Sequence, residues 1–158
     1  LQDGALRRTR STHRVAELQA QADADGIHSN LGIAHTRWAT HGVPAVHNAH
    51  PHFSHGPGAD APTSKPGRIA LVHNGIIENH EELRRELQAK GYVFLSQTDT
   101  EVVPQLITFY LKQGKTPHEA LSATLKRLEG AFALGIVLIP QRDTQRHTDT
   151  IRFLIPIW

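Results

Sequence analysis

The sequence has 158 residues, of which 39% are hydrophobic and 20% are charged, and its formal net charge at pH 7 is +2. This length and composition suit one globular domain, and no stretch approaches the roughly 18 consecutive apolar residues of a membrane-spanning helix. No cysteine occurs, which excludes disulfides and thiolate metal sites. The chain begins at Leu1 and shows no secretory leader, so we expect a cytoplasmic protein without a membrane partner.

The basic residues are spread along the chain except for one cluster near its start, at Arg7, Arg8, Arg10 and Arg14. Clustered basic side chains can bind nucleic-acid phosphates, but no aromatic residue is interleaved with this cluster. We interpret it as a solvated surface and expect no nucleic-acid partner. A steep salt dependence of DNA binding would support the alternative.

The first half of the chain predicts few regular elements. Residues 11–22 fit a short helix, and residues 30–38 fit a strand that enters a loop. Residues 39–67 are rich in Gly, Pro, Ala and His without a helical period, which predicts a long loop. The apolar run 68–73 predicts a short strand that ends at Asn74-Gly75.

The second half predicts three helices. Asn79 can cap the first helix. After a predicted strand at 92–95, Asp99 or Thr100 can cap a second helix that ends near residue 113. The third helix begins at a clear signal that combines a cap, a first-turn proline and a capping-box acid: Thr116, Pro117 and Glu119.

We expect the third helix to close at Gly130. The continuous apolar run 131–139 then predicts a strand buried on both faces. The chain is therefore a mixture of α and β elements, and the pattern alone leaves strand pairing open. Residues 141–150 are polar and the apolar residues 151–158 have no place in the pattern.

Four short motifs contain residues suited to binding and chemistry: HTRWATHG at 35–42, NAHPH at 48–52, HNGIIENH at 73–80 and TDTE at 98–101. Arg37 can clamp a carboxylate through two parallel hydrogen bonds, and the Asp99 carboxylate suits an ammonium group. Asn74 and Gly75 offer a side-chain amide and an unhindered backbone N–H, a plausible oxyanion hole. Each also has an ordinary alternative, because Asn-Gly is often a turn, Asp99 can cap a helix and Arg37 can be a surface residue.

The strings HTRWATHG, HNGIIENH and TDTE, in this order and spacing, resemble the glutaminase domain of the glucosamine-6-phosphate synthases. These are the isomerizing glutamine–fructose-6-phosphate aminotransferases of amino sugar biosynthesis, within the class II glutamine amidotransferases. The first string is specific to them, and the resemblance covers roughly residues 1–139. It implies an α+β fold of the N-terminal-nucleophile hydrolase type, an αββα sandwich of two antiparallel sheets, here incomplete at both ends.

The resemblance also implies roles for individual residues. Arg37 would hold the α-carboxylate of glutamine and Asp99 its α-amino group, with Thr40 and His41 in the same pocket. Trp38 would gate a channel for ammonia. Asn74 and Gly75 would form the oxyanion hole.

In this family a cysteine at the mature N-terminus attacks the glutamine amide and forms a thioester. Leu1 has no nucleophilic atom, so we expect the chain alone to lack glutaminase activity. The resemblance also implies that the opening strand of the family is missing, which would leave a sheet edge unpaired, so we expect only marginal stability. Fructose 6-phosphate would be a partner only through an absent isomerase domain, and the full-length enzyme would be a homodimer. We divide the chain into a partial glutamine amidotransferase type 2 domain, 1–140, and a divergent tail, 141–158.

Two alternatives remain open. One is a glutamine-binding module without catalysis, which calorimetry with glutamine would distinguish from an inactive fragment. The other is a metal protein built on the histidines, since six of the 12 lie between His35 and His55 and imidazole binds zinc. Residues 35–59 contain no carboxylate or cysteine and no H-E-x-x-H pattern, so we expect no metal and no other cofactor.

Overall fold

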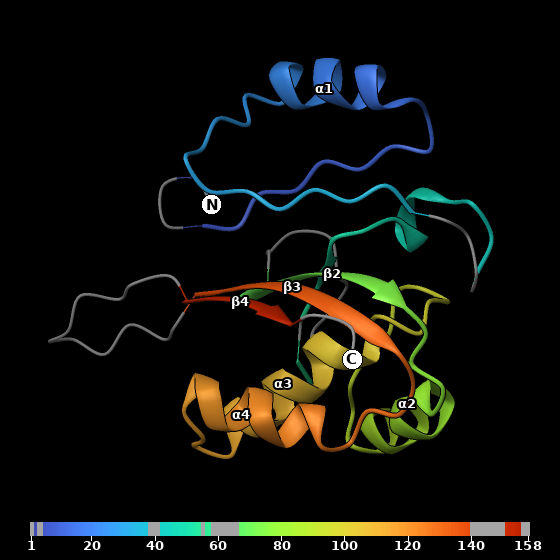
Figure 1. Cartoon of the computed structure of the whole chain (residues 1–158), viewed down its shortest axis with the longest axis vertical. Coiled ribbons are helices and arrows are strands. Elements are labelled where there is room, and N and C mark those ends of the chain that lie inside the picture. Colours follow the sequence, from blue (N-terminus) through green and yellow to red (C-terminus); the bar gives the residue numbers. More distant parts are fainter. Residues whose placement is uncertain are drawn as a thin grey trace, which may run out of the picture.

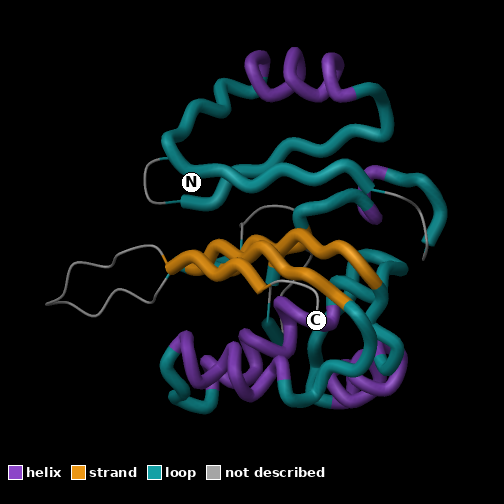
Figure 2. The backbone as a smooth tube through the Cα atoms, viewed as in Figure 1, coloured by secondary structure: helices purple, strands orange, loops and turns teal. Residues whose placement is uncertain are grey.

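The computed structural model describes residue 2 and residues 5–37, 42–54, 56–57, 67–139 and 151–155. A central sheet is covered on one face by three helices (Figures 1 and 2), which are α2 (His80–Ala89), α3 (Val102–Lys112) and α4 (Pro117–Leu125). The N-terminal stretch covers the other face and carries α1 (Val15–Ala24), which lies farthest from the sheet. Within the described ranges, no helix is long and apolar enough to cross a lipid bilayer.

The sheet has four strands in the order β1-β2-β3-β4, and every neighbouring pair is antiparallel. Its strands are β1 (His52–Phe53), β2 (Ile69–Gly75), β3 (Phe132–Leu138) and β4 (Ile151–Ile155). The longest pairing joins β2 and β3 along their full length, from Ile69 opposite Leu138 to Gly75 opposite Phe132. The α+β class is therefore confirmed.

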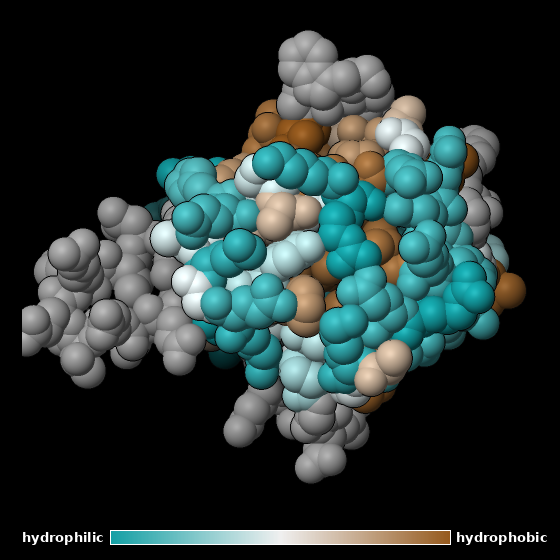
Figure 3. All heavy atoms as spheres, turned by 90° about the horizontal axis from the view of Figure 1, so that it is seen from below, coloured by the Kyte–Doolittle hydropathy of each residue, from teal (hydrophilic) through white to brown (hydrophobic). Residues whose placement is uncertain are grey.

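Alternation along β2 divides the core between the two faces of the sheet. Ile69 and Leu71 are fully buried in a large cluster with residues of the three helices, among them Leu83 and Leu106. Ala70 belongs to a smaller cluster on the opposite face, with Leu6, Phe53 and Val137. Figure 3 views the molecule from the helical side, where most of the visible surface is hydrophilic, so the helices bury their apolar faces toward the sheet.

The predicted strands at 68–73 and 131–139 and the three predicted helices are all present. The capping box of α4 is confirmed, because Thr116 accepts from the Glu119 backbone N–H while the Glu119 side chain accepts from Thr116. The expected end of α4 at Gly130 is wrong. The helix stops at Leu125, after which the chain continues in tight turns such as Arg127 N–H to Thr124 O.

Two further details of the prediction are wrong. Residues 92–95 do not form a strand, and Tyr92 makes only an isolated bridge to Pro57. Asn79 precedes α2 but its side chain does not cap that helix. Its amide instead donates to Arg127 O and accepts from Glu129 N–H, so it holds the start of α2 against the turn after α4.

The regions near the two chain ends also differ from the prediction. Residues 30–37 belong to no strand, so the described residues contain one sheet where a sandwich has two. The apolar residues 151–155, which had no predicted place, form β4 and pair with β3. The domain boundary at residue 140 stays a prediction, since 140–150 lie outside the described residues.

Candidate functional site

A cavity of about 290 Å³ opens at the end of β2, in the part of the sheet that the short β1 does not reach. Four residues predicted from three separate motifs meet there: Arg37, Asn74, Gly75 and Asp99. The predicted site residues Trp38, Thr40 and His41 lie outside the described part of the chain. The remaining lining residues are His35, His50, His73, Ile76 and Thr100.

Gly75 is required by the local geometry of the β2 end. Its φ is +118°, and an added Cβ would lie only 2.1 Å from the carbonyl oxygen of Ala131. The bond from Ile76 N–H to Ala131 O, 3.0 Å, shows that Gly75 and Phe132 form a non-hydrogen-bonded pair. The N–H of Gly75 therefore points away from β3, toward the edge of β2 on which β1 and His50 lie.

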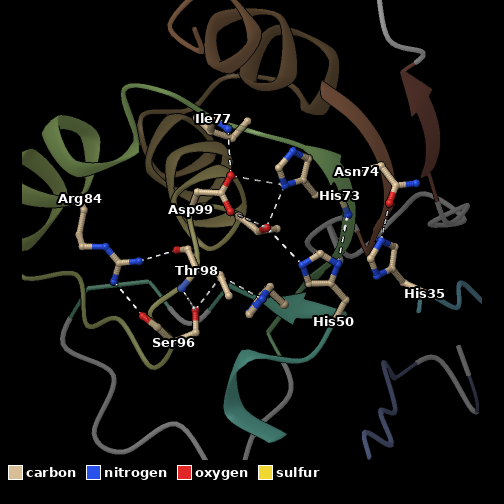
Figure 4. Close-up of polar contacts among 11 residues, drawn as sticks. His35, His50, His73, Asn74, Ile77, Arg84, Ser96, Thr98 and Asp99 are labelled. Atoms are coloured by element: carbon tan, nitrogen blue, oxygen red, sulfur yellow. Dashed lines mark hydrogen bonds and ion pairs between the residues drawn. The ribbon is translucent and has the colours of Figure 1, made fainter. Parts of the chain in front are cut away.

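Asn74 is held by a histidine from the N-terminal stretch. The Asn74 Oδ1 atom lies 2.7 Å from His35 Nε2, as Figure 4 shows. Because an amide oxygen only accepts, His35 Nε2 must carry the proton and donate. The Asn74 amide nitrogen has no hydrogen-bond partner among the described residues, so it and the Gly75 N–H are two donors at one end of the cavity.

Asp99 lies in the loop before α3, and its role differs from the predicted helix cap. The helix begins at Val102, and Asp99 instead accepts from the backbone N–H of Ile77 through Oδ2 at 2.9 Å. The Thr100 hydroxyl donates to Oδ1 at 3.4 Å. Asp99 is only 4% exposed, yet a carboxylate has about four acceptor positions, so a ligand N–H can still be accommodated.

Arg37 supplies the positive charge of the cavity. Its guanidinium is partly buried and donates through Nη2 to Gly42 O at 3.2 Å. A guanidinium has five N–H donors in a fixed fork, a geometry that matches a carboxylate. The cavity thus combines one cation and one buried anion, Asp99, as an α-amino acid zwitterion requires.

The other members of the TDTE motif brace the loop that presents Asp99. Glu101 is buried and accepts from the backbone N–H groups of Leu95 and Ser96 and from the Ser96 hydroxyl. The hydroxyl of Thr98 shares hydrogen bonds with Ser96 and with His52 Nε2. The loop is thus fixed by its own side chains. Glu101 bonds the N–H of Leu95 and the helix end at Leu87 O bonds the N–H of Tyr92, so these two N–H groups of the predicted strand at 92–95 are not available for a sheet.

The cavity-lining rings of His35 and His50 lie close to a third ring, that of His52: the His50 centroid is 4.3 Å from His35 and 5.0 Å from His52. Burial, together with the neighbouring His35 and His73, lowers the pKa of His50 to about 3. Burial also lowers the pKa of His52 well below its ordinary value. Both rings are therefore neutral at pH 7, and the described residues contain no group of three or more His, Cys, Asp or Glu that could hold a metal.

Two arginines of the basic N-terminal cluster hold the segment that carries His50, which corrects their interpretation as solvated. Arg8 donates to Pro51 O at 3.2 Å and stacks over the ring of Phe53. Arg10 donates to the carbonyl oxygens of residues 47 and 49 at 3.2 and 3.0 Å. These guanidiniums satisfy backbone carbonyls of the NAHPH motif, so part of the cluster is structural.

The sequence predicted only a possible helix cap for Thr100, only the alternative metal site for His35 and His50, and no role for His73, although all four line the cavity. Each of them lies inside one of the four motifs. Spacing along the chain cannot show that segments 35–37, 48–52 and 98–101 converge.

Comparisons with known proteins agree on the relationship of the chain. A family profile described as a glutamine amidotransferase domain matches residues 53–150. A glutamine–fructose-6-phosphate aminotransferase (isomerizing) from Bordetella pertussis is 60% identical over 134 residues, 85% of this chain and 21% of that protein. The Pseudomonas putida protein of the same name is 51% identical over 142 residues, 90% of this chain and 21% of its own length.

Among solved structures, the glutamine phosphoribosylpyrophosphate amidotransferase from B. subtilis, complexed with ADP and GMP, superposes with a TM-score of 0.50. It is 28% identical, and the match covers 66% of this chain and 20% of that one. This likeness confirms the predicted N-terminal-nucleophile hydrolase type of fold. The chain spans about a fifth of the length of the relatives it matches.

Proposed function

Since this chain belongs to the glutamine amidotransferase domain family, we propose that it is part of the glutamine-hydrolysing domain of a glutamine–fructose-6-phosphate aminotransferase. The two relatives described above carry that name and share 60% and 51% of their aligned residues with it. In this proposal the domain releases ammonia from glutamine. A separate sugar-isomerising part of the protein uses that ammonia on fructose 6-phosphate to make glucosamine 6-phosphate.

The observation that carries the proposal is the meeting of Arg37, Asp99 and the Asn74-Gly75 pair in one cavity. Arg37 binds the α-carboxylate of glutamine through two N–H donors, and Asp99 accepts from the α-ammonium group. Their opposite charges select a zwitterion, because an amine without a carboxylate or an acid without an amine leaves one buried charge unpaired.

The side-chain amide of glutamine then lies toward the end of β2. An attack on its carbonyl carbon places negative charge on the carbonyl oxygen. The Asn74 amide and the Gly75 N–H are two donors that stabilise this oxyanion, and the Gly75 donor is part of the rigid end of a strand. Trp38, Thr40 and His41 complete the pocket and the ammonia channel gate in the same proposal.

Hydrolysis also needs a nucleophile, which in this family is a cysteine thiol. The 158 residues contain no cysteine, so we expect them to bind glutamine without releasing ammonia. A non-catalytic glutamine-binding module is the second candidate, because it needs the same binding groups and no thiol. It predicts that the full-length protein also releases no ammonia from glutamine, whereas the first candidate predicts that the full-length protein does. The intramolecular bonds of Arg8 and Arg10 support the further proposal that nucleic acid is not a partner. A cytoplasmic location and a homodimeric full-length enzyme remain part of the proposal.

Calorimetric titration of the 158-residue chain with L-glutamine tests the binding site. We expect saturable binding that Arg37→Ala and Asp99→Asn each weaken at least tenfold, since each leaves one ligand charge unpaired. Arg85→Ala is a matched control, because Arg85 is an exposed arginine on α2 outside the cavity. An affinity for glutamine that survives both site substitutions would contradict the proposed site.

Ammonia release is the second measurement. The chain and its Arg37→Ala variant should both give the rate of a buffer blank in a coupled glutamate dehydrogenase assay. Release above the blank that disappears in Arg37→Ala would show that these residues contain a nucleophile of their own, contrary to the proposal.

A further inference from the structure

The hydroxyl of Thr100 is the point at which three side chains of the site meet. Its oxygen lies 3.2 Å from His50 Nε2, 2.9 Å from His73 Nδ1 and 3.4 Å from Asp99 Oδ1. Thr100 is 1% exposed. These partners come from the loop before β1, from β2 and from the loop before α3, so one hydroxyl joins three separate segments.

Simple donor and acceptor counting fixes the direction of each bond. The backbone N–H of His73 points at His50 Nδ1, 3.5 Å away, so Nδ1 accepts and the proton of His50 is on Nε2. His50 therefore donates to Thr100. A carboxylate only accepts, so the single hydroxyl proton of Thr100 goes to Asp99.

The remaining contact must then be a donation from His73 Nδ1–H to the second lone pair of Thr100. The hydroxyl gives one bond and accepts two, which is its full capacity. It has no lone pair left to act as a nucleophile, although it lines the cavity. The His50 imidazole is neutral in this arrangement, because its Nδ1 accepts a hydrogen bond, and this agrees with the lowered pKa of His50.

We infer that Thr100 is a positioning residue that orients the Asp99 carboxylate to receive the α-ammonium group of glutamine. Asp99 is held at Oδ1 by Thr100 and at Oδ2 by the Ile77 N–H, and His73 Nδ1 lies 3.9 Å from Oδ2. With both oxygens held, the carboxylate plane cannot rotate, and the remaining lone pairs keep a fixed direction. The inference rests on the proposed function, since it assigns to Asp99 the ammonium of that ligand.

Three substitutions separate positioning from general structural damage. Thr100→Val keeps the shape and removes the hydroxyl, whereas Thr100→Ser keeps the hydroxyl. Thr98→Val is the matched control, because Thr98 is also 1% exposed and its hydroxyl also bonds a histidine, His52 at 3.1 Å. The Thr98 hydroxyl braces the loop but does not bond Asp99, so its loss should weaken both ligands alike without a selective loss of ammonium recognition.

The decisive readout is the ratio of the dissociation constants for glutaramate and L-glutamine, because glutaramate is glutamine without its α-amino group. Damage that only loosens the pocket weakens both ligands and leaves this ratio unchanged. We expect Thr100→Val to lower the ratio at least fivefold, and Thr98→Val and Thr100→Ser to change it less than twofold. Ligand-observed NMR measures both constants on the 158-residue chain.

The imidazole ¹⁵N shifts of His50 and His73 supply a readout that does not depend on ligand. The parent chain should show the Nε2–H form of His50 and the Nδ1–H form of His73. Thr100→Val removes the hydroxyl that both rings bond, so the ¹⁵N shifts of both rings should change. An unchanged ratio in Thr100→Val, or the opposite tautomers in the parent, would overturn the inference while leaving the proposed function intact. A parent chain that binds neither ligand would overturn the proposed function, and the inference with it.

Discussion

Replacing Gly75 by alanine tests whether the end of β2 is built around a residue without a side chain. At a φ of +118° the new Cβ would lie 2.1 Å from the Ala131 carbonyl oxygen. Ordinary carbon–oxygen contacts are about 3.3 Å or longer, so the two strands would have to separate by about 1 Å. That shift would break the 3.0 Å bond from Ile76 N–H to Ala131 O.

The magnitude follows from adding these effects. The left-handed backbone costs a non-glycine residue about 1–2 kcal/mol, and the steric overlap adds about 1–3 kcal/mol. We therefore expect Gly75→Ala to lower the free energy of unfolding by about 2–5 kcal/mol. Gly114→Ala is the matched control, because its φ is +84° and nothing lies within 4 Å of the added Cβ.

Urea unfolding followed by tryptophan fluorescence and circular dichroism measures both free energies. Gly114→Ala should lower the free energy of unfolding only by the cost of the left-handed backbone, about 1–2 kcal/mol. Equal losses in the two variants would refute the reasoning, because they would show that β2 and β3 are not in close contact at Gly75. Glutamine binding measured on the folded fraction of Gly75→Ala should be weaker as well, since the displaced residue carries one of the two oxyanion donors.

Three further predictions concern stability. Thr116→Ala should lower the free energy of unfolding, measured in urea, by about 1 kcal/mol, because it removes the capping box of α4. Arg10→Ala should lower the free energy of unfolding by about 1–2 kcal/mol and weaken glutamine binding, because Arg10 donates to the carbonyl oxygens of residues 47 and 49. Arg14→Ala, in the same cluster, should lower it less. Stability should fall as pH drops below about 6.5 toward 3, because the unfolded chain protonates His50 while the folded chain keeps it neutral; His50→Gln should flatten that fall.

Local signals in the sequence predicted the elements whose stability is local. The helix that begins with Thr116 and Pro117 and the strands at 68–73 and 131–139 carry their own caps and apolar runs, and the structure contains all of them. The predictions failed where a distant group decides the local structure. Residues 92–95 look like a strand, yet Glu101 binds the N–H groups at its end.

The same distinction holds for the site. Arg37, Asp99 and the Asn74-Gly75 pair were predicted from their chemistry, and the structure brings them into one cavity. Asp99 was expected as a possible helix cap, but its partner is the Ile77 N–H from another segment. The contacts of Thr100 could not be predicted, because they depend on how three segments pack together and not on any spacing along the chain.

A crystal structure of the 158-residue chain with L-glutamine tests the central claim most directly. We predict a bidentate contact of about 2.7–2.9 Å between Arg37 and the ligand α-carboxylate, with the ammonium group at a similar distance from Asp99. The side-chain carbonyl should point at the Asn74 amide and the Gly75 N–H. Glutamine bound elsewhere, or bound here with its ammonium group away from Asp99, would contradict the account.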